Sequence, residues 1–90
     1  MKNQEIAKIF FEIGEILELQ GVAFKPQTYQ QAAITIDEMP EDIEEVYKKG
    51  GIKLLMDIPA IGDSMAAKIE EYLIHGRVCL YEELKNSQKF

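Results

Sequence analysis

Residues 54–69 of this 90-residue chain read LLMDIPAIGDSMAAKI, and this stretch decides the fold. Pro59 has no backbone N–H and a fixed φ, so a helix that approaches it has to end there. Gly62 tolerates positive φ without steric cost, and we expect it to turn the chain sharply. The apolar spacing on either side then predicts two short helices, 52–56 and 63–75, joined by a tight hairpin.

The hairpin leads directly into the start of the second helix. Asp63 and Ser64 open this helix, and both residue types favour a helix N-terminus. The first N–H groups of a helix have no partner within the helix and attract anions, of which phosphate is the commonest. We therefore expect the backbone N–H groups of Ala60, Ile61, Gly62 and Ser64 to hold a phosphate. The alternative is a tight turn that only packs two helices together.

Length and composition indicate one domain, covering residues 1–90. With 47% hydrophobic residues, the chain has enough apolar side chains for a core. Cys79 is the only cysteine, so no internal disulfide forms, and we expect a reducing, cytoplasmic location. We expect no membrane association, because no apolar run approaches the roughly 18–20 residues of a membrane span and the N-terminus lacks the layout of a signal peptide.

The charge of the chain is unevenly distributed. The net charge of −6 argues against strong nucleic-acid binding. However, residues 1–47 contain three basic and ten acidic residues, whereas residues 48–90 contain seven basic and six acidic ones. The half that contains the hairpin can therefore accept a phosphate, although the first half repels it. We expect any DNA binding to be weak.

Apolar residues at helical spacing also predict helices outside the hairpin. These helices cover about residues 4–20, with Asn3 as N-cap, and residues 26–38, 41–49 and 81–86, and the tail 87–90 is expected to fray. Gly50 and Gly51 separate the helix at 41–49 from the hairpin. No strand-type alternation occurs, so the predicted fold is all-α.

The ordered set of segments resembles a known family. The hairpin has the pattern Leu-x-x-Ile-Pro-x-Ile-Gly-x-x-x-Ala-x-Lys-Ile at 55–69, with Tyr-Gln-Gln-Ala-Ala upstream at 29–33 and Gly-Arg and Tyr-Glu-Glu-Leu within 76–84. Together these resemble the N-terminal eight-kilodalton domain of family X DNA polymerases, the family of polymerase beta, in its archaeal and bacterial form. The resemblance runs from about Asn3 to Lys85.

The resemblance implies a compact bundle of four to five helices with a helix-hairpin-helix motif at about 52–75. It implies binding of gapped or single-stranded DNA, without sequence specificity, in gap-filling or base-excision repair. The implied DNA contacts are the hairpin amides named above and the side chains of Lys25, Tyr29, Lys68 and Arg77. The backbone carbonyls of Met56, Ile58 and Ile61 match those that often bind a monovalent cation, Na⁺ or K⁺, and no other cofactor is expected.

Whether the chain is an enzyme stays open at this point. Many members of this family are deoxyribose-phosphate lyases, and their Schiff-base lysine falls on Lys68. From residue type alone, the alternative is a solvated lysine paired with Glu71, about one turn away. Nucleotidyl transfer is not expected, since the chain has no Asp-x-Asp pair to hold two metal ions.

Two further questions concern the context of the domain. The chain is either a fragment of a longer polymerase, whose catalytic domain would then be its partner, or a stand-alone copy, and we expect a monomer. A protein-interaction domain with a relic hairpin is a second alternative function. It is favoured by the acidity of the chain and by Ala60, where the family usually has glycine.

Overall fold

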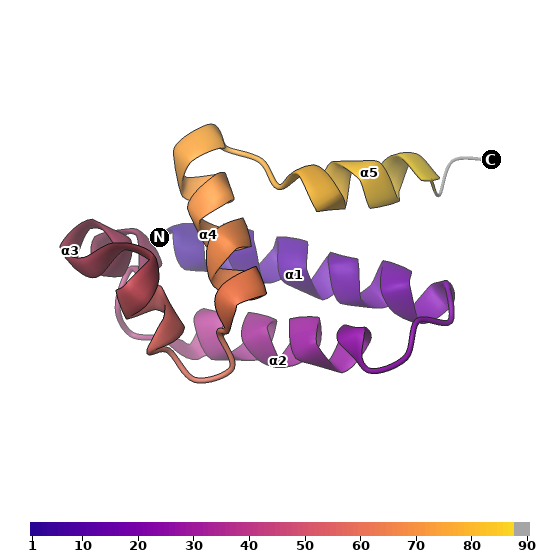
Figure 1. Ribbon diagram of the computed structural model, residues 1–90, viewed down its shortest axis with the longest axis horizontal. Helices are drawn as coiled ribbons and strands as arrows, with labels where there is room; N and C mark the ends of the chain where they lie inside the picture. The colour runs from indigo at the N-terminus through magenta and orange to yellow at the C-terminus, as the bar shows by residue number, and fades with distance from the viewer. Residues whose placement is uncertain (88–90) are drawn as a thin grey trace.

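The computed structural model describes residues 1–87, which form five helices and no strand. The helices are α1 (Lys2–Leu19), α2 (Lys25–Glu38), α3 (Ile43–Met56), α4 (Asp63–His75) and α5 (Cys79–Ser87). Figure 1 shows α1 and α2 running antiparallel, with α3 at one end, α4 crossing the pair and α5 extending alongside α1. The predicted all-α fold is confirmed. Most of the tail that was expected to fray, 88–90, lies outside the described residues.

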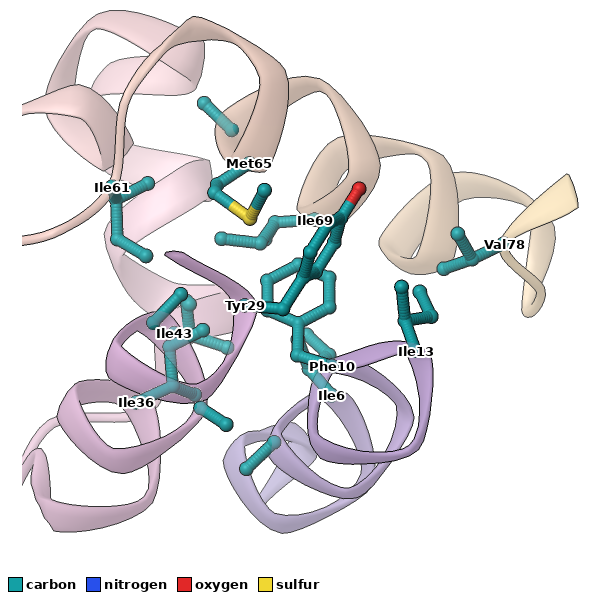
Figure 2. Close-up of a cluster of buried hydrophobic side chains, with 14 of the residues drawn as sticks. Ile6, Phe10, Ile13, Tyr29, Ile36, Ile43, Ile61, Met65, Ile69 and Val78 are labelled. Atoms are coloured by element: carbon teal, nitrogen blue, oxygen red, sulfur yellow. The ribbon is translucent and has the colours of Figure 1, made fainter. Parts of the chain in front are cut away.

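The helices share one hydrophobic core, built from the apolar stripes that the sequence predicted. Figure 2 shows side chains of α1, α2 and α4 meeting around the ring of Tyr29, which packs edge-on against Phe10 with 5.7 Å between ring centroids. Gly14 allows α1 and α2 to approach closely, because a Cβ at this position would lie 3.1 Å from the carbonyl oxygen of Pro26. The glycine inside α1 is thus explained by helix–helix packing.

Asn3 does not cap α1, contrary to the prediction. The helix begins at Lys2 with Met1 as N-cap and has no side-chain cap. Asn3 is instead fully buried, and its Nδ2 donates to the carbonyl oxygens of Ile36, at 3.3 Å, and Glu41, at 2.7 Å. Its Oδ1 accepts the N–H of Ile43 at 2.8 Å. One side chain therefore joins the start of α1 to the end of α2 and the start of α3.

The helices predicted at 41–49 and 52–56 form one continuous element, α3, with a sharp kink. The kink lies at Gly51, whose φ of 64° and ψ of −153° are not helical. The predicted break at the glycine pair is therefore present, although no loop separates the halves. The helix begins at Ile43, two residues later than predicted, because the Asp42 side chain accepts the Glu44 N–H at 3.0 Å and caps it.

The hairpin turns at a different residue from the one predicted. Gly62 has an extended backbone, with φ −94° and ψ −168°, and serves as the N-cap of α4. The positive φ occurs at Ala60, at 70°. A residue with a Cβ pays about 1–2 kcal/mol for such a backbone. The buried side chain of Ile61, which is 3% exposed, holds the turn against the core.

Three tyrosine–glutamate hydrogen bonds link the outer helices to their neighbours. Tyr47 of α3 donates to Glu70 of α4 at 2.6 Å. Tyr72 of α4 donates to Glu5 of α1, and Tyr81 of α5 donates to Glu12 of α1. By contrast, the described residues contain two ion pairs, both between exposed side chains three residues apart on one helix, at Lys2–Glu5 and Lys48–Glu45. Phenol–carboxylate bonds, rather than ion pairs, therefore join helix to helix.

The buried amide of Asn3 generates a stability prediction. Asn3→Ala leaves the Ile43 N–H and two carbonyl groups without their partner, and we expect the free energy of unfolding to fall by about 3 kcal/mol. Urea denaturation followed by circular dichroism measures this change. Gln4→Ala, an exposed neighbour on the same helix, is the control and should alter stability by less than about 0.5 kcal/mol. Equal stabilities of the two variants would contradict the bridging role.

Candidate functional site

The hairpin presents unpartnered backbone N–H groups on its exposed side. Ala60, Gly62 and Ser64 are exposed, and within residues 1–87 no hydrogen bond uses their N–H groups. Ile61 differs from the other predicted amides, since its N–H donates to the Ile58 carbonyl at 3.1 Å inside the turn. No side chain caps α4, so its first turn remains available to an anion.

A pocket beside this turn brings together most of the predicted side chains. Its volume is about 260 Å³, and its lining includes Lys25, Tyr29, Ser64 and Lys68. These residues come from the first turns of α2 and the first two turns of α4. The Tyr29 ring packs in the core while its edge lines the pocket, and burial raises the pKa of its phenol. We call this the lysine pocket.

Lys68 is partly buried, which lowers the pKa of its amine. Its Nζ donates to Ser64 Oγ at 2.8 Å and lies 5.8 Å from the centre of the Tyr29 ring. Burial lowers the pKa of the Lys68 amine, Glu71 partly opposes this effect, and Lys25 lowers the pKa further. A lysine of lowered pKa has the neutral, nucleophilic form more readily available.

The alternative pairing of Lys68 with Glu71 does not occur. Glu71 Oε2 instead accepts the backbone N–H of Cys79 at 2.9 Å. Hydrogen bonds from Cys79 are the main cause that lowers the pKa of the Glu71 carboxyl. This carboxylate thereby caps α5, which begins at Cys79 rather than at the predicted Tyr81. Lys68 therefore lines the lysine pocket with Ser64, and not Glu71, as its hydrogen-bond partner.

Arg77 lies apart from the lysine pocket. It lines a different hollow, of about 310 Å³, together with Glu70, Glu71 and His75. The structure thus brings Lys25, Tyr29, Ser64 and Lys68 together and places Arg77 among carboxylates on another part of the surface.

Two adjoining hollows beside the hairpin have no carboxylate in their linings. A second hollow, of about 290 Å³, is lined by Gln27, Thr28, Gln31 and Ala60. It shares Thr28 with the lysine pocket, so the two form a continuous surface on α2 and the hairpin. Neither lining includes an acidic residue, in a chain whose net charge is −6. An exposed carboxylate does occur nearby at Asp63, outside both linings.

Phe24 is a candidate site residue that the sequence reasoning missed. Its side chain is 85% exposed, and its backbone has a φ of 68°. It is the N-cap of α2 and precedes Lys25. An exposed ring on strained backbone works against stability, which suggests a role in binding. The signal available in the sequence was an aromatic residue directly before a lysine in the short connector that precedes Pro26.

The predicted cation ligands are backbone carbonyls at the same corner. In residues 1–87, no hydrogen bond reaches the carbonyls of Met56 and Ile61, and the Ile58 carbonyl accepts one, which leaves it a second lone pair. The three oxygens are thus chemically suited to a monovalent cation. Across the same residues, no cluster of histidine, cysteine or acidic side chains could hold a transition metal.

None of the described helices is both long and apolar enough to cross a membrane.

A comparison with curated proteins gave no match. The profile of the helix-hairpin-helix domain family matches residues 1–78, which cover the hairpin, four of the five helices and all of the lysine-pocket lining except Leu80. The chain belongs to the helix-hairpin-helix domain family.

Proposed function

We propose that this domain binds the sugar-phosphate backbone of gapped or single-stranded DNA, weakly and without reading base sequence. Helix-hairpin-helix domains generally bind DNA. In this proposal the domain is a monomer that acts in the cytoplasm, in gap-filling or base-excision repair, as the N-terminal module of a family X type polymerase or as its stand-alone counterpart.

One observation carries the proposal. The unpartnered N–H groups of Ala60, Gly62 and Ser64 adjoin a pocket with two lysines, and the linings beside them contain no carboxylate. Backbone amides and a lysine ammonium bind phosphate oxygens irrespective of the base attached. The two linings are therefore free of carboxylates in an acidic chain, whereas the exposed Asp63, between Gly62 and Ser64 in the sequence, opposes an anion at the turn.

A monovalent cation fits the same mode of binding. The carbonyls of Met56, Ile58 and Ile61 would hold Na⁺ or K⁺, and the ion would add positive charge beside the phosphate. The amides and lysines of the site do not depend on it for their own contacts.

The phosphate contact is tested by blocking the approach to the turn. Gly62→Val keeps an allowed backbone, and a Cβ at this position meets no atom within 4 Å, so the variant should fold normally. We expect it to weaken binding of a fluorescein-labelled, 5′-phosphorylated gapped DNA about tenfold, because the branched side chain excludes the phosphate. Fluorescence anisotropy measures this change, and Ala67→Val, also exposed on α4, is the matched control.

The salt dependence provides an independent measure of the same contact. Two lysine–phosphate contacts predict that affinity falls roughly tenfold between 50 and 200 mM salt. Lys25→Ala and Lys68→Ala should each reduce this slope by about one, whereas exposed Lys53→Ala on α3 should not change it. DNA binding that is unaffected by salt, by Gly62→Val and by both lysine substitutions would rule out the phosphate contact.

Phe24 supplies a flat face on which an unpaired base can stack, one residue from the pocket lysine at position 25. Stacking on an aromatic side chain contributes about 1–3 kcal/mol per base. Phe24→Ala should therefore weaken binding of single-stranded or gapped DNA about tenfold and leave binding of intact duplex almost unchanged. Phe11→Ala, which removes another exposed ring, on α1 and outside the lysine pocket, is the control. An equal loss on duplex DNA would contradict stacking.

A second candidate function, deoxyribose-phosphate lyase activity, is favoured by the lowered pKa of Lys68. The neutral amine would add to the C1′ aldehyde of an abasic deoxyribose and lose water to form an imine. Lys25 lies close enough to lower the pKa of Lys68 and is suited to hold the 5′-phosphate of the same nucleotide. The hydroxyl of Ser64, 2.8 Å from the amine, fixes the direction in which Lys68 points.

The lyase activity is tested by reductive trapping. Borohydride should convert the imine of wild-type protein and abasic DNA into a stable adduct, and Lys68→Ala should abolish it. The yield should rise with pH as Lys68 loses its proton, with a midpoint below that of an ordinary lysine. Lys25→Gln removes a repulsive charge, which raises the Lys68 pKa and shifts the profile to higher pH. An adduct that persists in Lys68→Ala would disprove the assignment.

A further inference from the structure

A second surface of the domain combines apolar side chains with unpaired acid. A groove of about 470 Å³ lies between α1 and α2, and its apolar floor includes Ala7, Phe11, Ala33 and Ile34. Phe11 and Ile34 are 45% and 42% exposed. Ala7 and Ala33 are themselves part of the core, and Phe11 lies about 100° around α1 from its neighbour, the core residue Phe10, so the groove runs along the edge of the core. We call this surface the acidic groove.

The rim of the acidic groove is strongly negative. Its lining contains the carboxylates of Glu12, Glu15, Asp37 and Glu38 against the single ammonium of Lys8. Glu12 accepts the hydroxyl of Tyr81, whereas the other three carboxylates make no ion pair within residues 1–87. The groove thus has an apolar floor and an acidic rim, and three of its four carboxylates make no ion pair with another described residue.

The charge selects among possible occupants. Phosphate is repelled by four carboxylates, so DNA is not the ligand of this face. A second copy of the chain carries a net charge of −6 and is repelled in the same way. A cationic segment is attracted, and its apolar side chains can cover Phe11 and Ile34. The α1 side of the groove extends from Gln4 to Glu15, a length of about three helical turns.

We propose that the acidic groove binds a basic amphipathic helix of a partner protein. Such a helix places apolar residues at positions i, i+3, i+4 and i+7 on the floor and lysine or arginine against the carboxylate rim. This surface shares no residue with the lysine pocket, so partner binding and DNA binding are separate properties of the domain.

A designed peptide tests the proposal on the whole chain. The probe is a fluorescein-labelled 14-residue peptide with leucines at helical spacing and lysines on its other face. Its control is a scrambled peptide of the same composition without an apolar stripe. We expect the amphipathic peptide to bind about tenfold more tightly in anisotropy titrations and to shift backbone amide resonances in residues 4–15 and 33–38.

Matched variants separate the groove from general acidity. Phe11→Ala with Ile34→Ala should weaken peptide binding about tenfold and leave DNA binding unchanged. Phe24→Ala with Leu19→Ala removes two exposed apolar side chains elsewhere and should leave peptide binding unchanged. Thermal unfolding confirms that each variant is folded.

Three outcomes would overturn the proposal. The first is equal binding of the scrambled peptide, which shows attraction by net charge alone. The second is an equal loss in both pairs of variants, which shows that the peptide does not bind specifically in the groove. The third is a dimer in sedimentation equilibrium that Phe11→Glu dissociates, which assigns the groove to a second copy. Failure of DNA binding leaves the proposal unaffected, because the two assays use different surfaces.

Discussion

The fold depends on a single buried amide. Asn3 supplies three hydrogen bonds to backbone groups at the corner where α2 ends and α3 begins. Two of these bonds are buried and the bond to Glu41 is partly buried, so water competes little for them and their loss would leave polar groups unpaired. The direction in which α3 leaves α2 is therefore fixed, and with it the position of the hairpin at the far end of α3.

The lysine pocket is a consequence of how α4 packs. Met65 and Ile69 are buried in the core, and helical periodicity places Lys68 at the edge of that buried face. The Lys68 amine is consequently partly shielded from water but still reaches the surface. Its carboxylate neighbour, Glu71, is occupied at the start of α5. Helical spacing predicts that Lys68 pairs with Glu71. In the structure Glu71 instead accepts a hydrogen bond from Cys79, eight residues after it, and Lys68 makes no ion pair with it.

Patterns within the sequence were sufficient for the helices and the hairpin, which follow from spacing of three and four residues and from proline and glycine. The side chains of the lysine pocket were expected only from the resemblance to family X polymerases, and Arg77, which was expected with them, lies elsewhere. The sequence reasoning failed where the partner atom is distant. Asn3 was interpreted as a cap because asparagine is a favourable one, yet its partners lie 33 to 40 residues away. The positive φ was assigned to Gly62, although the anchoring of Ile61 in the core imposes it on Ala60.

The small number of ion pairs in residues 1–87 determines how the stability of the fold responds to salt. Between the helices, apolar contacts and phenol-to-carboxylate hydrogen bonds stabilise the structure, and the two ion pairs found in residues 1–87 are exposed and contribute little. The attraction of a polyanion to the lysine pocket, by contrast, is governed by counterions. A change in salt concentration therefore alters the affinity of the lysine pocket for a polyanion and has little effect on the stability of the fold.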